Sequence, residues 1–237
     1  LEKALQKNNF NVSFILIPNG EKAKSLNIME QLLYRLLHFK CDRSSTFLAL
    51  GGGVVGDITG FLAAIFMRGV DYIQIPTTLL AMVDSSIGGK TGVNLLKGKN
   101  LVGAFWQPKA VLIDPLFLNT LPKREFTSAM GEIIKYGVTL DESLFIKIME
   151  NLDELLNKTN DSLILDVIIN CAKIKSQIIV EDEKEQGRRK ILNFGHTFGH
   201  ALETFLGFEK IRHGEAVSYG ILFACKLSME FSNLSQK

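Results

Sequence analysis

The sequence has 237 residues, of which 46% are hydrophobic and 22% charged, a composition typical of a folded protein with a substantial core. A formal net charge of +2 gives no support for nucleic-acid binding, and the longest apolar run, at residues 61–67, is too short to span a bilayer. The three cysteines have no C-x-x-C spacing and no signal-peptide pattern opens the chain, so we expect reduced thiols in a cytoplasmic protein.

The first part of the chain predicts alternating helices and strands. Helices are expected at residues 1–8, 28–39 and 57–66, and strands at 12–17, 46–50, 72–75 and 110–113. Buried strands joined by helical crossovers favour a parallel sheet that is covered on both faces.

From residue 126 onward the pattern predicts helices alone, at 126–136, 142–156, 162–180, 193–206 and 213–231. The boundary near Leu121-Pro122 therefore divides the chain into an α/β domain (residues 1–122) and an all-helical domain (residues 123–237). A cleft between two such parts is a common place for a ligand. Both ends interrupt a helical pattern, so we expect an internal portion of a longer protein.

A glycine-rich turn, GGGVVG at residues 51–56, follows the second predicted strand and opens a helix. It satisfies G-x-G-x-x-G, in which backbone N–H groups approach a pyrophosphate at a helix N-terminus. The acidic residue that usually closes the next strand is missing, because Asp71 precedes its strand. The turn therefore fits either an unusual dinucleotide site or a tight strand–helix connection without a ligand.

A second glycine-rich segment, GGKT at residues 88–91, resembles the end of a P-loop. Asp84 occupies the position where that motif needs glycine, which excludes a nucleoside-triphosphatase. Cations near this flexible backbone would suit a phosphate monoester or a carboxylate, and a solvated lysine-rich loop is the alternative. The cations in question are Arg68, Lys90, Lys97 and Lys99.

Three of the four histidines lie between residues 196 and 213, and the fourth, His38, is expected on the surface. His196 and His200 are four residues apart and share a helix face, and His213 opens the next helix. Two imidazoles and a carboxylate with an open position form a catalytic zinc set, whereas the absence of H-E-x-x-H excludes a zinc protease. Spacing leaves open which of six candidates bind metal: His196, His200, His213, Glu132, Glu203 and Glu215.

Glu132 and Lys135 are three residues apart, so they share a helix face. A plain surface ion pair is the usual explanation for this spacing.

Four segments closely resemble one family: MRGVDYIQIPTTLLAMVDSSIGGKTGVN, GKNLVGAFWQP, MGEIIKYG and LNFGHTFGHALE are similar to 3-dehydroquinate synthases. The resemblance runs from Pro18 to the end of the sequence. It implies a Rossmann-like parallel-sheet NAD domain followed by an all-helical metal- and substrate-binding domain. It also implies that N-terminal sheet strands and a C-terminal lysine of the family are missing from this chain.

The resemblance implies a site residue by residue. A divalent metal, zinc or cobalt, would bind to Glu132, His196 and His213. NAD would be met by Glu21, Lys22, Gly52, Gly53, Val54, Asp57, Thr77, Thr78, Lys99, Phe117, Thr120 and Leu121. The substrate, 3-deoxy-D-arabino-heptulosonate 7-phosphate, would contact Arg68, Asp84, Lys90, Asn100, Lys135, Lys175, Arg189 and Asn193. Catalytic roles would fall to Glu185, His200, Lys135 and Lys90, and Arg68 would reach across a homodimer interface.

The implied activity is that of a lyase of the shikimate pathway. NAD would oxidise the substrate transiently, phosphate would leave by elimination, and re-reduction, ring opening and an aldol closure would give 3-dehydroquinate. Alternatives are the related 2-deoxy-scyllo-inosose and valiolone synthases, metal-dependent glycerol dehydrogenases, and a non-catalytic interaction module. The combination that favours dehydroquinate synthase over the other cyclases is Lys175, Arg189, Asn193 and His200. We expect no nucleic-acid or membrane partner.

Overall fold

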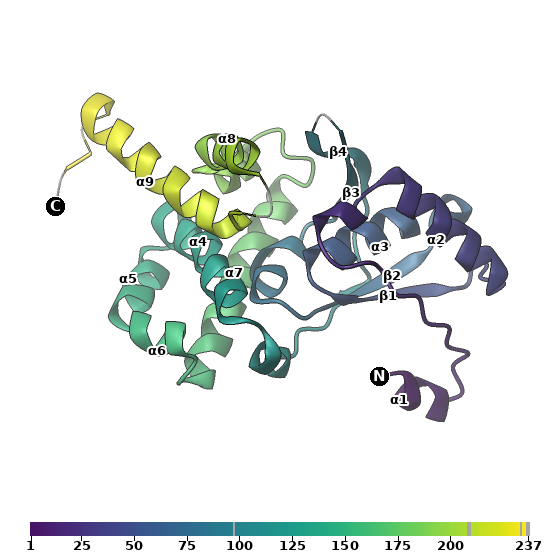
Figure 1. Ribbon diagram of the computed structural model, residues 1–237. Coiled ribbons are helices and arrows are strands. Elements are labelled where there is room, and N and C mark those ends of the chain that lie inside the picture. The colour runs from purple at the N-terminus through teal and green to yellow at the C-terminus, as the bar shows by residue number, and fades with distance from the viewer. Residues whose placement is uncertain (97, 208–209, 233, 236–237) are drawn as a thin grey trace.

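Figure 1 shows the computed structural model of the protein, which describes residues 1–96, 98–207, 210–232 and 234–235. Its first half contains a parallel three-stranded sheet in the order β1-β2-β5, formed by β1 (Thr46–Gly51), β2 (Asp71–Pro76) and β5 (Ala110–Val111). Gly51 pairs with Pro76 in register, so the residues that follow both strands emerge at the same edge of the sheet. The parallel sheet expected from the sequence is confirmed.

Helices α2 (Leu26–His38) and α3 (Gly53–Ile65) pack on one face of this sheet in a shared hydrophobic cluster (Figure 1). On the other face of β1, Leu48 and Leu50 are 36% and 37% exposed. The expectation that both faces are covered is therefore wrong for β1, whereas Ile75 of β2, which pairs with Leu50, is buried. The first helix is short, α1 (Glu2–Lys7).

The strand predicted at residues 12–17 does not form. A strand needs a neighbour for its hydrogen bonds, and no described strand pairs with this segment. Ile15 and Ile17 nevertheless pack against the α/β cluster, which explains the apolar pattern.

An antiparallel hairpin of β3 (Lys90–Leu95) and β4 (Gly98–Phe105) was missed by the sequence pattern. The pattern was hidden by glycines that the pairing itself requires, since Gly92 lies opposite Gly103. A Cβ on Gly103 would lie 2.0 Å from the Thr91 carbonyl oxygen. The hairpin packs against α3 through the fully buried Val93.

Short turns of helix connect these elements: η1 (Glu21–Ala23), η2 (Phe66–Arg68), the π-helix η3 (Ala81–Ser85), η4 (Pro115–Thr120) and η5 (Arg188–Asn193). Met82 and Val83 of η3 are fully buried in the hydrophobic cluster of the second half of the chain. This packing places Asp84 where the two halves meet.

The second half is helical, as predicted, with α4 (Lys123–Leu140), α5 (Glu142–Glu150), α6 (Leu152–Asn157), α7 (Asp161–Glu181), α8 (His196–Leu206) and α9 (His213–Phe231). Asp141 caps α5 and Asn160 caps α7, each by accepting a bond from a backbone N–H in the first turn. The single helix predicted at 142–156 divides at Asn151. Within the described residues, no helix has the length and apolar character needed to cross a membrane.

Candidate metal and cofactor site

Glycines allow three helices to approach one another closely in the second half. A Cβ on Gly131 of α4 would lie 2.1 Å from the carbonyl oxygen of Gly214, and one on Gly214 would lie 1.8 Å from that of Ser128. A Cβ on Gly220 of α9 would lie 1.8 Å from the carbonyl oxygen of Gly195. The backbone of α9 therefore touches α4 and the turn that opens α8.

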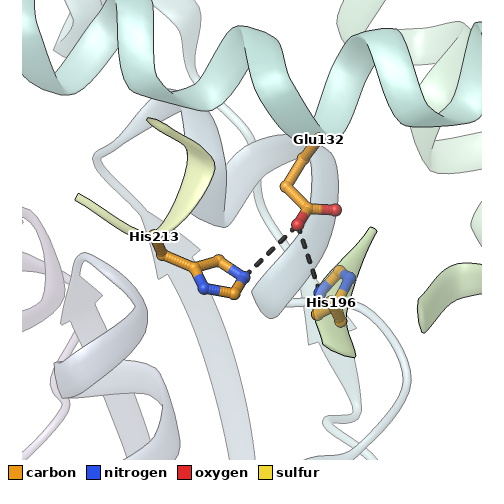
Figure 2. A group of neighbouring side chains, drawn as sticks. All are labelled: Glu132, His196 and His213. Atoms are coloured by element: carbon orange, nitrogen blue, oxygen red, sulfur yellow. Dashed lines mark ion pairs between the residues drawn. The ribbon is translucent and has the colours of Figure 1, made fainter. Parts of the chain in front are cut away.

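Next to each of these contact points in the sequence is a residue whose side chain can bind a metal. Glu132 follows Gly131, His196 follows Gly195, and His213 precedes Gly214, so the close packing brings the three side chains together. Glu132 Oε1 lies 3.4 Å from His196 Nε2 and 3.3 Å from His213 Nε2 (Figure 2). Two imidazole nitrogens and one carboxylate oxygen within 4.8 Å of one another form a set that can hold a divalent metal.

One oxygen of Glu132, the acidic residue of this group, is buried without a hydrogen bond from the described residues. Glu132 is fully buried, and its Oε1 has no hydrogen-bond partner among the described residues. A buried carboxylate oxygen without a hydrogen-bond partner is costly, and a cation near it, a bound metal or a protonated His213, would offset that cost. The donor set and the unpartnered atom both fit a divalent metal.

The other metal candidates lie differently. Glu215 faces away from the group, because it accepts two bonds from Arg124 at 2.7 and 2.9 Å and caps α9. His200 and Glu203 form an overlapping second group with His213. The structure thus reduces the six candidates to two sets that share one histidine.

The charges around Glu132 favour its ionised form. Lys135 forms an ion pair with Glu132, and both side chains are buried, so the expectation of a surface pair is wrong. Burial opposes ionisation, but Lys135 and His213 outweigh it and hold the pKa of Glu132 below its usual range.

The two histidines of the group differ in charge. Burial lowers the pKa of His196 to about 4, so this imidazole is neutral at pH 7. Burial also disfavours the charged form of His213, but Glu132 and Glu203 outweigh it and raise the pKa of His213 to about 9. His213 is therefore protonated at pH 7 between two carboxylates.

Asp84 lies next to this group and is firmly held. Lys175 donates to its Oδ1 at 2.7 Å and to its carbonyl oxygen at 2.6 Å, and the buried Tyr136 donates to Oδ1 at 2.6 Å. These partners keep the pKa of Asp84 below its usual range despite burial, which acts in the opposite direction. Tyr136 belongs to the MGEIIKYG segment, but nothing in the sequence distinguished it as a partner of Asp84.

A second polar cluster surrounds Glu185. Lys90 forms an ion pair with Glu185, and Asn193 donates a hydrogen bond to it. Glu185 adopts a positive φ of 58°. These three predicted site residues come from β3, the segment after α7 and η5, so the structure brings together residues that lie far apart in the chain.

Arg189 joins the glycine-rich segment before β3 to the helical half. Its buried guanidinium donates to the carbonyl oxygen of Gly88 at 3.0 Å. A Cβ on Gly88 would lie 2.6 Å from that guanidinium, and the φ of Gly88 is +108°, so the position requires glycine.

Arg68 is set apart from the other predicted substrate residues. It is exposed at the end of η2, and among the described residues no hydrogen bond or ion pair joins it to the other seven. Lys97, one of the cations noted in the sequence, lies outside the described residues.

The glycine turn opens α3 and faces η3. Gly52 is the N-cap of α3, and a Cβ there would lie 3.0 Å from Thr78 Cγ2. A Cβ on Gly53 would lie 2.9 Å from the Ser85 hydroxyl, which is buried without a hydrogen-bond partner among the described residues. Ser85 follows Asp84, so the glycine turn contacts the same helical turn, η3, that carries Asp84.

Lys24 is a residue that sequence reasoning missed. It is 4% exposed, and its Nζ donates to Asp57 Oδ2 at 2.6 Å and to Asn100 Oδ1 at 2.5 Å. It thereby joins two predicted site residues from α3 and β4. Burial raises the pKa of Asp57 to about 6, although Lys24 acts in the opposite direction. No motif in the sequence identifies Lys24, because its role depends on distant partners.

The remaining predicted NAD residues are distributed over η1, α3, β4, η4 and the segments that follow β2 and η4. Thr77 follows β2, and its backbone N–H donates to the Gly51 carbonyl oxygen at 2.9 Å. Leu121 packs in the same cluster as Leu79, and Lys99 forms an ion pair with Glu203 at 3.0 Å. The others of this set are Glu21, Lys22, Val54, Phe117 and Thr120.

Comparison with known proteins identifies the relatives of the chain. The family model for the N-terminal part of 3-dehydroquinate synthase matches residues 14–128, and the model for its C-terminal part matches residues 129–237. A 3-dehydroquinate synthase of Thermoanaerobacter pseudethanolicus is 51% identical over 237 residues, which are 100% of this chain and 66% of that relative. The chain therefore spans slightly less than two thirds of the relative's length.

Solved structures are similar over nearly the whole chain. A 2-epi-5-epi-valiolone synthase from Streptomyces hygroscopicus subsp. jinggangensis, with NAD+ and Zn2+ bound, has a TM-score of 0.93 at 29% identity and covers 99% of this chain and 66% of its own. A 2-deoxy-scyllo-inosose synthase with carbaglucose-6-phosphate, NAD+ and Co2+ has a TM-score of 0.84 at 32% identity. The match covers 92% of this chain and 59% of that synthase. The sequence matches are with dehydroquinate synthases, and the chain belongs to the 3-dehydroquinate synthase family.

Proposed function

We propose that this protein catalyses the 3-dehydroquinate synthase reaction, in which 3-deoxy-D-arabino-heptulosonate 7-phosphate gives 3-dehydroquinate and phosphate. The observation that carries the proposal is the group of Glu132, His196 and His213 around a buried carboxylate, in a chain that also has a glycine turn of dinucleotide type. The 51% identical relative carries this name, and the two similar cyclase structures hold NAD+ with Zn2+ or Co2+.

Glu132, His196 and His213 would hold zinc or cobalt, and the glycine turn would hold NAD. When bound, NAD supplies a reversible hydride acceptor and the metal supplies a Lewis acid for the sugar hydroxyls. We assign NAD to the following residues: Glu21, Lys22, Gly52, Gly53, Val54, Asp57, Thr77, Thr78, Lys99, Phe117, Thr120 and Leu121.

The substrate is anionic, and the cationic side chains of the site suit its phosphate and carboxylate. Lys90 directly follows the glycine-rich segment and Arg189 donates to the Gly88 carbonyl oxygen in it, while Lys175 lies on α7 against Asp84. We assign the substrate to these three cations together with Arg68, Asp84, Asn100, Lys135 and Asn193.

Proton transfer falls to His200 and Glu185, and we also assign catalytic roles to Lys90, which pairs with Glu185, and to Lys135, which pairs with Glu132. The His200 ring centroid lies 5.2 Å from that of His196, and burial lowers the pKa of His200, so a neutral imidazole is available near pH 7. Glu185 contacts Lys90 and Asn193, and these contacts support our assignment of Glu185 to the phosphate end of the substrate.

We further propose that the protein is a cytoplasmic homodimer. The exposed Arg68 would reach the partner's site, and the cysteines of the described residues are all free thiols. Residues 1–122 would form the NAD domain and residues 123–237 the metal and substrate domain.

Phosphate release from the heptulosonate tests the proposal. With NAD+ and Zn2+ we expect stoichiometric phosphate and 3-dehydroquinate without net NADH. Net NADH from a polyol would instead indicate a dehydrogenase, and phosphate release from a hexose 6-phosphate alone would indicate one of the other cyclases. The absence of turnover with all substrates would favour a non-catalytic role.

A further inference from the structure

Glu203 is a buried carboxylate on α8 that the proposed metal set does not use. Its side chain is 2% exposed. Its Oε1 lies 3.5 Å from His213 Nδ1 and accepts a hydrogen bond from Lys99 Nζ at 3.0 Å. An ionised side chain is rarely buried unless it is paired, so the partners of Glu203 indicate its role.

The two nitrogens of His213 face two different carboxylates. Nε2 lies 3.3 Å from Glu132 Oε1, and Nδ1 lies on the side of Glu203. A neutral imidazole has one nitrogen that carries a proton and one that carries a lone pair. If Nε2 gives its lone pair to a metal, Nδ1 must carry the proton and can donate it to Glu203.

A second metal site on His200, Glu203 and His213 is the competing interpretation of the same atoms. The two groups share His213, whose single lone pair cannot serve both. Glu203 already receives the ammonium of Lys99, whereas Glu132 Oε1 has no hydrogen-bond partner among the described residues. These contacts favour a metal at Glu132 and a hydrogen-bond acceptor at Glu203.

We propose that Glu203 is a positioning residue for the metal site: it accepts the Nδ1 proton of His213 and so holds the imidazole with Nε2 free to bind the metal. The proposal rests on the metal site proposed above. The separation of 3.5 Å exceeds the usual N–H···O range of roughly 2.7–3.2 Å, so a small rotation of the ring completes the bond.

Lys99 extends this arrangement to the other half of the protein. It lies on β4, and its ion pair with Glu203 joins the hairpin to α8, which lies beside it (Figure 1). The metal ligand His213, the carboxylate of Glu203 and the ammonium of Lys99 therefore form one continuous chain of polar contacts. The orientation of a metal ligand is thus tied to a residue that we assign to NAD.

Zinc affinity and the absorption spectrum of the Co2+-loaded protein test the role of Glu203. Glu203→Met removes both acceptor oxygens at similar volume, and we expect roughly 10–100-fold weaker zinc binding and an altered Co2+ d–d spectrum. Glu203→Gln keeps a neutral acceptor, so its loss should be smaller than that of Glu203→Met. Asp166→Asn removes a carboxylate that pairs with Lys147, and it should leave both readouts unchanged.

Thermal unfolding of the metal-free variants separates folding from metal binding. If Glu203→Met does not fold, Glu203→Gln carries the test, and weaker zinc binding with a shifted Co2+ spectrum supports the proposal. Wild-type zinc affinity and spectrum in every folded variant would overturn it while leaving the metal site intact. A wild-type protein that binds neither zinc nor cobalt would instead overturn the metal site itself.

Discussion

Gly131 of α4 lies so close to Gly214 of α9 that a Cβ on Gly131 would stand 2.1 Å from the Gly214 carbonyl oxygen. This contact fixes the distance between the two helices at the point where one carries Glu132 and the other His213. The positions of Glu132 and His213 relative to each other therefore depend on this backbone contact.

Gly131→Ala should force α9 away from α4. Overpacking of this kind costs about 1–3 kcal/mol of stability, and the displaced His213 should weaken zinc binding as well. Thermal unfolding and zinc titration measure the two effects. Gly187→Ala is the matched control, because a Cβ there meets only an ordinary contact at 3.7 Å. Unchanged zinc affinity in the Gly131→Ala variant would show that the helix spacing does not set the site.

His196→Ala should abolish stoichiometric zinc binding and activity, because it removes one of three ligands. Glu132→Ala should do the same and also destabilise the fold, since Lys135 would be buried without its partner at a cost of about 3–5 kcal/mol. Metal content after dialysis and the free energy of unfolding separate the two variants. Full zinc occupancy with wild-type kcat in either variant would contradict the ligand assignment.

Metal binding should release a proton from His213. Its folded-state pKa of about 9 lies above the ordinary value of 6.5, so at pH 7 the metal must displace that proton, and zinc affinity should fall as the pH is lowered. In the metal-free protein, the stability from this charge is fully present below pH 6.5 and is lost as the pH rises through about 9. Calorimetry in buffers of different ionisation enthalpy counts the protons. Zinc binding at pH 7 without proton release would contradict a His213 that is protonated in the metal-free protein and becomes a ligand.

Lys90→Ala should weaken binding of the sugar phosphate far more than that of NAD. A charge-assisted hydrogen bond contributes roughly 1.5–3 kcal/mol, which corresponds to about a 10–100-fold rise in KM for the substrate. Steady-state kinetics and a separate NAD titration compare the two ligands. Equal losses for both would mean that Lys90 only supports the hairpin that it opens.

The sequence indicated candidate residues for the site but not the contacts that surround them. Spacing alone indicates that His196 and His200 share a helix face. Only the fold shows that Glu132 lies against His196 and His213, and that Gly131 contacts Gly214. The β3–β4 hairpin was missed because Gly92 and Gly103 satisfy a close backbone pairing, which local periodicity does not record.

Lys24 and Tyr136 were missed for a related reason. Each is a common residue in an ordinary local context, and its role comes from partners far away in the chain. The strand expected at residues 12–17 is the opposite kind of error, an element that was predicted and does not form. An apolar alternation forms a strand only where a neighbouring strand pairs with it. Local sequence patterns therefore predict secondary-structure elements and motifs, whereas buried polar contacts can be identified only from the three-dimensional structure.

Anomalous diffraction at the zinc edge, from crystals of the protein grown with Zn2+ and NAD+, tests the central claim most directly. One peak between Glu132 Oε1 and the Nε2 atoms of His196 and His213, with the nicotinamide beside it, is the expected result. A peak between His200, Glu203 and His213, or none at either group, would contradict the account.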